Sequence, residues 1–186
     1  MSVRDKIVEA ALKLLARKSF SRVSVREIAD EANVAKGTVF HYFKSKFDIG
    51  LAVLDMFYRV FVETPLRKII DSDMSFEEKI GAIVDHVLDV MLKSNVKYMV
   101  MLVSIYEEIV EKGREDIVKH LYLKGISLFE EFFRENNIHN PAVKAQLFAA
   151  LLDGLALHCM IYPELFRSRE RRASIVNEVL SLLKGE

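Results

Sequence analysis

The chain has 186 residues, of which 51% are hydrophobic and 29% are charged, and it contains one cysteine and no tryptophan. This composition excludes a disordered or low-complexity protein, and the length suffices for one large domain or two small ones. A single cysteine cannot form an internal disulfide or a zinc site of the Cys₄ or Cys₂His₂ type. We therefore expect a cytoplasmic protein without a metal or another cofactor.

Two stretches of the chain bear on membranes. Positions 4–6 are all charged, so the first turn is not the basic end that leads into the apolar run of a signal peptide. The most apolar stretch, 147–162, is shorter than a bilayer span and contains Asp153 and His158. We expect a soluble protein with no membrane partner.

The net charge of zero is the sum of two unequal parts. Residues 1–50 hold ten Lys and Arg against six Asp and Glu, a net charge of +4. Residues 51–186 hold 17 against 21, a net charge of −4. Such an asymmetry indicates a basic binding head on an acidic body.

Apolar residues recur with the helical period along almost the whole chain, and no segment shows a sustained strand-like alternation. The pattern predicts an all-α protein with a head of three short helices over 1–47 and a larger helical body over 48–186. About nine helices are expected, over 3–18, 24–32, 35–43, 45–65, 75–93, 96–112, 115–136, 140–160 and 167–183.

Polar residues mark several of these helix ends. Ser24 followed by Glu27 predicts a capping box, and Ser45 begins the fourth helix. Asn33 stands where the apolar pattern breaks, and asparagine tolerates the left-handed conformation of a tight turn. Pro65 is expected to close the fourth helix, because proline disfavours the helical conformation in the residue before it.

Residues 24–43 are two short helices joined by a tight turn, which is the helix-turn-helix arrangement. In this arrangement the second helix enters the major groove of DNA and the first crosses the backbone. Val34, Val39 and Phe43 recur at spacings that bury them against the first helix of the chain. The residues left pointing outward offer lysine, imidazole and aromatic groups suited to phosphates and base edges. They are Lys36, Gly37, Phe40 and His41.

The unbroken run from Ser24 to Lys46 resembles the signature of the TetR family of bacterial and archaeal transcriptional regulators. The chain length and the small head on a larger helical body are also similar to that family. The resemblance implies that 1–47 is a DNA-binding domain and that 48–186 binds an effector and dimerises. It implies groove-facing positions for Lys36, Gly37, Thr38, Phe40 and His41, a base contact for Arg26, and phosphate contacts for Ser24, Thr38, Tyr42 and Lys46.

Three residues of the run depart from the usual family pattern. Asn33 stands for the common turn glycine, and Ala35 replaces a Ser or Thr cap, a change that typically costs about 1 kcal/mol. Phe40 replaces a tyrosine and lacks its hydroxyl. Apolar contact with a thymine methyl is therefore a better expectation at this position than a phosphate contact.

The body is rich in Phe, Met and Tyr at helical spacing. These residues suit an ordinary core or an apolar ligand cavity, and periodicity does not separate the two. The resemblance implies a cavity among the middle helices, for a small apolar or aromatic effector. The candidate pocket residues are Phe61, His86, Met91, Tyr98, Met101, Leu102, Ile105, Tyr106, Tyr122, Phe129, Leu155 and His158.

The helix over 142–160 has apolar residues almost all round, so it must be covered on several sides. The resemblance implies that it pairs, together with the last helix, with its symmetry mates in a homodimer. A two-fold dimer places two recognition helices about 34–36 Å apart on a pseudo-palindrome of double-stranded DNA. The candidate interface residues are Phe148, Leu151, Leu152, Leu155, Ile175, Val179 and Leu182.

An enzyme is the main competing class. Cys159 and His158 are neighbours on a helix and point about 100° apart, so they cannot form a nucleophile–base pair, and no Glu-x-x-His pair of a di-metal bundle occurs. We therefore predict a transcriptional regulator and not an enzyme. The simplest mechanism is that of a repressor that binds its operator as a dimer and is released by a small-molecule effector. The alternatives are a helical ligand carrier without DNA activity and an activator of the same family.

Overall fold

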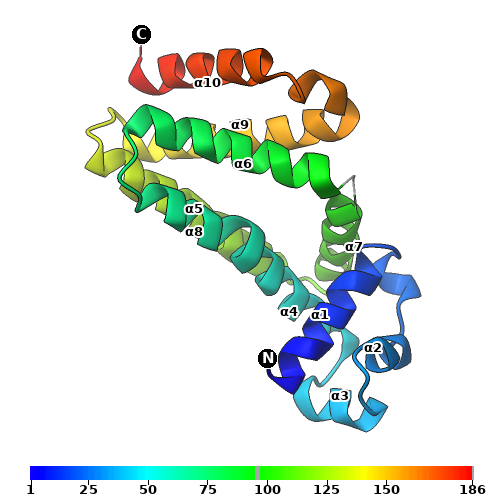
Figure 1. Cartoon of the computed structure of the whole chain (residues 1–186). Coiled ribbons are helices and arrows are strands. Elements are labelled where there is room, and N and C mark those ends of the chain that lie inside the picture. The colour runs from blue at the N-terminus through cyan, green and yellow to red at the C-terminus, as the bar shows by residue number, and fades with distance from the viewer. Residues whose placement is uncertain (95–96, 186) are drawn as a thin grey trace. The chain divides into compact units, whose positions relative to one another are not determined.

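The computed structural model describes residues 1–94 and 97–185, which form helices, short 3₁₀ turns and one π-helical segment and contain no strand (Figure 1). The described residues group into two compact units. The head unit comprises those of Met1–Val60 and Val96–Val118, and the body unit those of Phe61–Asn95 and Lys119–Glu186. The predicted all-α class is confirmed. The predicted domain boundary after residue 47 is drawn by function and not by packing. This boundary stays a prediction.

In the head unit, α1 packs on α2, α3 and α4, and its Ile7, Ala11 and Leu15 are buried. A capping box between Ser2 and Asp5 begins α1. The helices of this unit are α1 (Val3–Leu15), α2 (Val25–Glu31), α3 (Lys36–Tyr42), α4 (Lys46–Phe57) and α7 (Lys97–Glu111), with a 3₁₀ turn at Phe20–Arg22.

The head unit contains the predicted end of the first helix at Lys18 and the predicted start of a later helix at position 96. The first helix ends at Leu15 and not at Lys18, because the amides of Arg17 and Lys18 both donate to the carbonyl of Leu14. The chain leaves the helix there and buries Phe20. The predicted start of a later helix at position 96 lies outside the described residues.

The predicted end of the fourth helix at Pro65 is wrong. The chain stays helical after α4, through the π-helical segment Tyr58–Glu63 and α5 (Thr64–Ile70). Pro65 lies in the first turn of α5, where a helix tolerates a residue without an N–H. It cannot donate to the carbonyl of Phe61 four residues earlier, and the His86 Nε2–H donates to that oxygen at 2.8 Å. A locally widened helix and a side-chain donor thus accommodate the proline.

The body unit contains α5 and four longer helices. Asn140, the N-cap of α9, adopts the left-handed conformation (φ 53°) and makes no side-chain cap bond. If α4, the π-helical segment and α5 count as one helix, the described residues form nine helices. The longer helices are α6 (Phe76–Ser94), α8 (Glu115–Glu135), α9 (Pro141–Ile161) and α10 (Arg169–Lys184), with a 3₁₀ turn at Pro163–Phe166 before α10.

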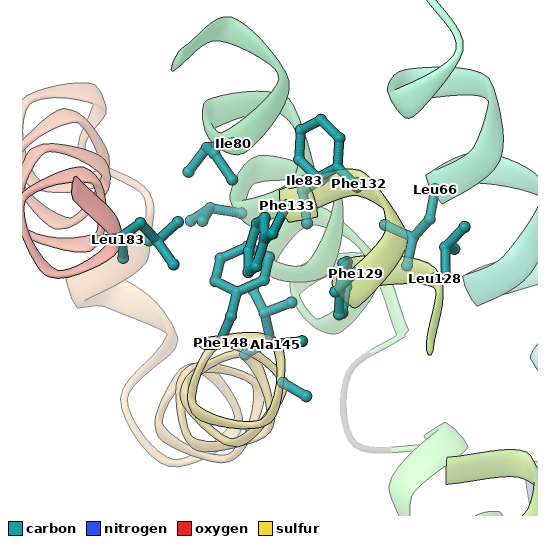
Figure 2. Packing of buried hydrophobic residues seen from close by; sticks show 14 of the residues in the cluster. Leu66, Ile80, Ile83, Leu128, Phe129, Phe132, Phe133, Ala145, Phe148 and Leu183 are labelled. Carbon is teal, nitrogen blue, oxygen red and sulfur yellow. The ribbon is translucent and has the colours of Figure 1, made fainter. Parts of the chain in front are cut away.

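Aromatic rings form the centre of the body unit (Figure 2). Phe148 of α9 lies 5.0 Å from Phe129 and 5.5 Å from Phe133, both of α8, between ring centroids. Phe76 of α6 lies 5.4 Å from Phe132. Edge-on and tilted pairs of this kind add to the stabilisation from burying the rings. The core of this unit is therefore packed with side chains from α6, α8 and α9.

Arg172 attaches α10 to α6. Its side chain is 17% exposed, and the guanidinium donates to Asp85 and Asp89, each at 2.9 Å, and to the Phe166 carbonyl at 2.6 Å. Partial burial opposes ionisation of Asp89, but Arg172 holds the pKa of this carboxyl below its usual value. Arg172, in the first turns of α10, is therefore a packed structural residue.

Candidate nucleic-acid interface

The turn between α2 and α3 has the conformation that the sequence predicts. Asn33 has a φ of 54°, in the left-handed region. The backbone N–H of Asn33 donates to the Asp30 backbone carbonyl at 3.1 Å, and the backbone N–H of Val34 donates to the Ala29 carbonyl at 3.0 Å. These bonds end α2 and fix the direction in which α3 leaves the turn.

The predicted capping box at the start of α2 is also present. The Ser24 hydroxyl accepts from the Glu27 amide at 3.2 Å, and the Glu27 carboxylate accepts from the Ser24 amide at 2.8 Å. Lys18 donates to the same carboxylate at 2.7 Å. The bond from Lys18, followed by those from Ser24, lowers the pKa of Glu27 to about 2.

An NMR titration of the side-chain carboxyl carbons should therefore find Glu27 ionised down to a pH of about 2 in the folded protein. Because the folded pKa is below the unfolded value of about 4.3, the capping contribution is complete above that pH and is lost as the pH falls towards 2. Lys18→Met should raise the pKa of Glu27 towards the unfolded value. A Glu27 pKa above 4 in the unmodified protein would contradict the geometry.

α3 is anchored by one buried side. Val39 is fully buried, and Phe43, directly after the helix, is buried as well. Ala35 forms the N-cap without a side-chain bond, as the alanine predicts. At about 100° per residue, Gly37 and His41 lie opposite the buried side, Lys36 and Phe40 lie on one flank, and Thr38 and Tyr42 lie on the other.

Most of the predicted contact residues are accessible. A Cβ at Gly37 would meet no atom within 4 Å, so the packing of the protein does not require this glycine, and the backbone is open to a close approach from outside. Thr38 and Lys46 are half-buried. The exposed members of the set are Ser24, Arg26, Lys36, Gly37, Phe40, His41 and Tyr42.

Lys46 is engaged inside the head unit. Its ammonium donates to the carbonyls of Phe20 at 2.9 Å and Val23 at 3.1 Å and lies 4.5 Å from the centre of the Phe20 ring. A Cβ at Gly50 would lie 2.6 Å from that ring, so glycine is needed for Phe20 to pack on α4. Lys46 therefore holds the 3₁₀ turn in place and has at most one N–H left for a phosphate.

Arg4 and Lys44 extend the basic surface beyond the predicted set. The Arg4 guanidinium lies 5.2 Å from the centre of the Phe43 ring, which brings a cation of α1 to the end of α3. Lys44 is exposed just after α3. In the sequence, Arg4 is a charged residue in the first turn of a helix, which fits a contact with the DNA backbone and a solvated helix face equally well.

The predicted effector-pocket residues are divided between the two units. Met101 and Ile105 of α7 are buried in the head unit, and Phe129 belongs to the aromatic core of the body unit. His86 bonds to the Phe61 carbonyl, also in the body unit. Tyr98, Leu102 and Tyr106 are the remaining members on α7, and Met91, Tyr122, Leu155 and His158 are the remaining members in the body unit. The cavity among the middle helices stays a prediction.

The body unit has a half-open pocket of about 270 Å³ between α9, the 3₁₀ turn Pro163–Phe166 and α10. Leu155 and His158, two of the predicted pocket residues, line it. Ile175, predicted for the dimer interface, lines it as well. Its volume is slightly below the range of about 300–1,000 Å³ that holds drug-sized ligands.

The predicted interface residues differ in how far the protomer itself buries them. Phe148, Leu152 and Val179 are buried in the protomer's own core and have little surface to offer a partner. Leu151, Leu155 and Ile175 pack partly against that core, whereas Leu182 is 66% exposed. A surface for another subunit must therefore include other residues of α9 and α10.

Sequence comparisons place the resemblance in the head. A model of the tetR family of bacterial regulatory proteins matches residues 7–53. The chain is 44% identical over 52 residues to the HTH-type regulator YuxN of Bacillus subtilis, covering 28% of this chain and 18% of that one. It is 33% identical over 69 residues to the regulator AcuR of Cereibacter sphaeroides, covering 37% and 32%. The match thus spans about a fifth to a third of the length of these relatives.

The fold as a whole is similar to solved transcriptional regulators. A regulator from Pseudomonas aeruginosa PAO1 has a TM-score of 0.78 at 21% identity, covering 98% of this chain and 90% of that one. NemR of E. coli in its reduced form has a TM-score of 0.75 at 20% identity, covering 98% of each chain. Residues 7–53, which contain the helix-turn-helix, match regulatory proteins in sequence, and the chain shares the fold of solved transcriptional regulators. The similarity in sequence to the tetR family thus lies in residues 7–53, and the similarity of the whole chain to these regulators is one of fold.

Proposed function

We propose that this protein is a repressor that binds a pseudo-palindromic operator as a homodimer and is released by a small apolar or aromatic effector. The observation that carries the proposal is the surface of α3. Val39 holds the helix on the head unit, while Lys36, Gly37 and His41 are exposed. A helix that presents donors and an open glycine backbone around the side opposite its anchor fits a major groove.

Apolar surface on α9 supports the dimer. Leu147 is 64% exposed although it is a large apolar side chain. A Cβ at Gly154 would meet no atom within 4 Å, so the protomer does not need the close approach that this glycine allows. Alternate spacings of four and three residues, as in a helix–helix seam, align Val143, Leu147, Ala150, Gly154, Leu157 and Ile161. This set, the α9 stripe, replaces the buried residues of the predicted interface.

A membrane is the other environment that could cover such a helix. By length and composition, α9 could cross a bilayer. Its other side, however, packs into the body core through Ala145, Phe148 and Leu152. A second subunit covers the stripe without removing that side from the core, and we therefore assign the stripe to the dimer.

Repression requires coupling between the effector and DNA. The effector must prefer a conformer that does not bind the operator, because equal affinity for both conformers would shift no population. NalD of Pseudomonas aeruginosa is a secondary repressor of a multidrug efflux pump, and its fold matches this chain with a TM-score of 0.60 at 21% identity. That likeness favours a repressor over an activator in this proposal.

The direct test is selection of DNA from a random double-stranded pool by the purified full-length protein. We expect enrichment of one inverted repeat with half-sites one helical turn apart or a multiple of it. A ligand carrier without DNA activity would enrich no sequence, and that outcome would refute the proposal. Compounds that raise the melting temperature in a thermal-shift screen can then be tested for release of the selected DNA.

Lys36→Ala and His41→Ala should each weaken binding to the selected operator about tenfold or more, with a smaller effect on random DNA, because base contacts carry the discrimination. Lys13→Ala, an exposed change on α1 that also removes one positive charge, is the matched control. Competition gel-shift titrations at fixed salt measure the ratio of the two affinities. An unchanged ratio in both variants would exclude a base contact by these side chains.

A further inference from the structure

The pocket of the body unit lies where α9, the 3₁₀ turn Pro163–Phe166 and α10 meet (Figure 1). These are the last three elements of the chain, and not the middle helices for which the sequence predicts an effector cavity. The inner wall of the pocket is apolar, because Phe166 is buried and Leu155 and Ile175 are partly buried. Its volume of about 270 Å³ suits a ligand that is smaller than a drug-sized molecule.

Three polar side chains line the open side of the same pocket. His158 comes from the last turn of α9, Tyr162 directly follows that helix, and Arg171 comes from the first turn of α10. All three residues are exposed. A guanidinium and a phenol are hydrogen-bond donors, and an imidazole carries an N–H on at least one ring nitrogen. In the described part of the chain no acidic residue lines the pocket, so its open side offers donors and positive charge to a ligand.

Arg171 differs from its neighbour Arg172. The guanidinium of Arg172 is held by Asp85 and Asp89. Among residues 1–94 and 97–185, by contrast, the side chain of Arg171 makes no ion pair and no hydrogen bond. Its backbone N–H donates to the Ser168 hydroxyl at 3.3 Å, a cap that fixes the position of the residue at the start of α10. An arginine stem packs on apolar surface while its head stays in water, so this guanidinium is available at the mouth of the pocket.

We propose that this pocket binds a small apolar carboxylate, such as an aromatic or short-chain aliphatic acid. The planar fork of the Arg171 guanidinium matches the two oxygens of a carboxylate. His158 and Tyr162 supply further donors at the same end, and the apolar body of the acid lies against the inner wall. The proposal goes beyond the proposed function, because it assigns a ligand site between α9 and α10 that does not depend on DNA binding.

The test is a titration of the full-length protein with benzoate, and separately with hexanoate, followed by NMR of isotope-labelled leucine and isoleucine methyl groups. We expect saturable shifts at Leu155 and Ile175. Benzamide keeps the ring but has no negative charge, and it should bind about tenfold or more weakly, because hydrogen bonds to charged groups are the stronger ones. Acetate keeps the carboxylate but lacks the apolar body, and it should also bind about tenfold or more weakly.

Arg171→Ala should weaken benzoate binding about tenfold or more, because it removes the charged donor. Arg169→Ala is the matched control, since Arg169 is an exposed arginine of the same helix turn that is not among the residues lining the pocket. This control should bind benzoate like the unmodified protein. Both variants should keep the unmodified melting temperature, because each changes an exposed side chain.

The outcomes are distinguishable. Shifts at Leu155 and Ile175 that require the carboxylate, the apolar body and Arg171 support the proposal. Equal binding of benzamide or acetate, unchanged affinity in Arg171→Ala, or no shifts with either acid overturns it. If Leu147→Glu, a variant of the α9 stripe that disrupts the proposed dimer, binds benzoate and the unmodified protein does not, a second copy of this chain fills the pocket instead. Because no DNA is present, a failure of the proposed function in the DNA selection leaves this result intact.

Discussion

Replacing Leu147 by glutamate should convert the proposed dimer into a monomer. In a two-fold interface the substitution occurs twice, and it returns two leucines to water while burying two carboxylates in an apolar seam. The lost burial alone amounts to about 3–6 kcal/mol, which raises the dissociation constant of the dimer at least about a hundredfold. Binding to the inverted repeat should weaken strongly, because each monomer would reach only one half-site.

Sedimentation equilibrium at micromolar concentration measures the change in mass. Leu123→Glu is the matched control, because Leu123 is an exposed leucine on α8 and not a member of the α9 stripe. This variant should remain a dimer. A dimeric Leu147→Glu protein would remove the α9 stripe from the interface, and a monomeric unmodified protein would refute the dimer itself.

Phe133→Ala should have the largest effect on stability. Phe133 is fully buried and contacts the rings of Phe76, Phe129, Phe132 and Phe148. The truncation leaves a cavity among rings that cannot all collapse into it, and we expect a loss of about 3–5 kcal/mol in the free energy of unfolding. Total stabilities of about 5–15 kcal/mol are usual, so the variant should be close to unfolding.

Denaturant unfolding at one fixed protomer concentration measures this loss, since a dimer's stability depends on concentration. Leu123→Ala provides the comparison, because it removes a large but exposed apolar side chain and should change the unfolding free energy little. A loss below about 1 kcal/mol for Phe133→Ala would show that the aromatic core is not packed as described.

Helix starts were predictable where one short polar side chain determines them. Ser24 and Ser45 each cap the helix that the sequence assigned to them, because a cap is a local interaction between residues three positions apart. The turn at Asn33 was predictable for the same reason. The outward face of α3 followed from period and burial over a short segment.

Contacts between distant segments were not predictable from local patterns. The local sequence predicts a helix end at Pro65. The helix continues because His86, from another helix, supplies a donor for the Phe61 carbonyl. The local sequence predicts a free cation at Lys46. In the folded protein, the carbonyls of Phe20 and Val23 accept from its ammonium. Apolar periodicity identified α9 as a helix covered on several sides, but which side the protomer itself covers depends on tertiary packing.

The left-handed turn at Asn33 has a consequence for the chemical lifetime of the protein. Among the described residues, the non-glycine positions with positive φ are all asparagines, at 33, 137 and 140. Asparagine deamidates when the backbone nitrogen of the next residue attacks its side-chain amide. Val34 and Ile138 crowd that nitrogen with branched side chains, and the nitrogen of Pro141 carries no hydrogen. At these turns, asparagine therefore provides the left-handed conformation, and its side-chain amide is expected to deamidate slowly.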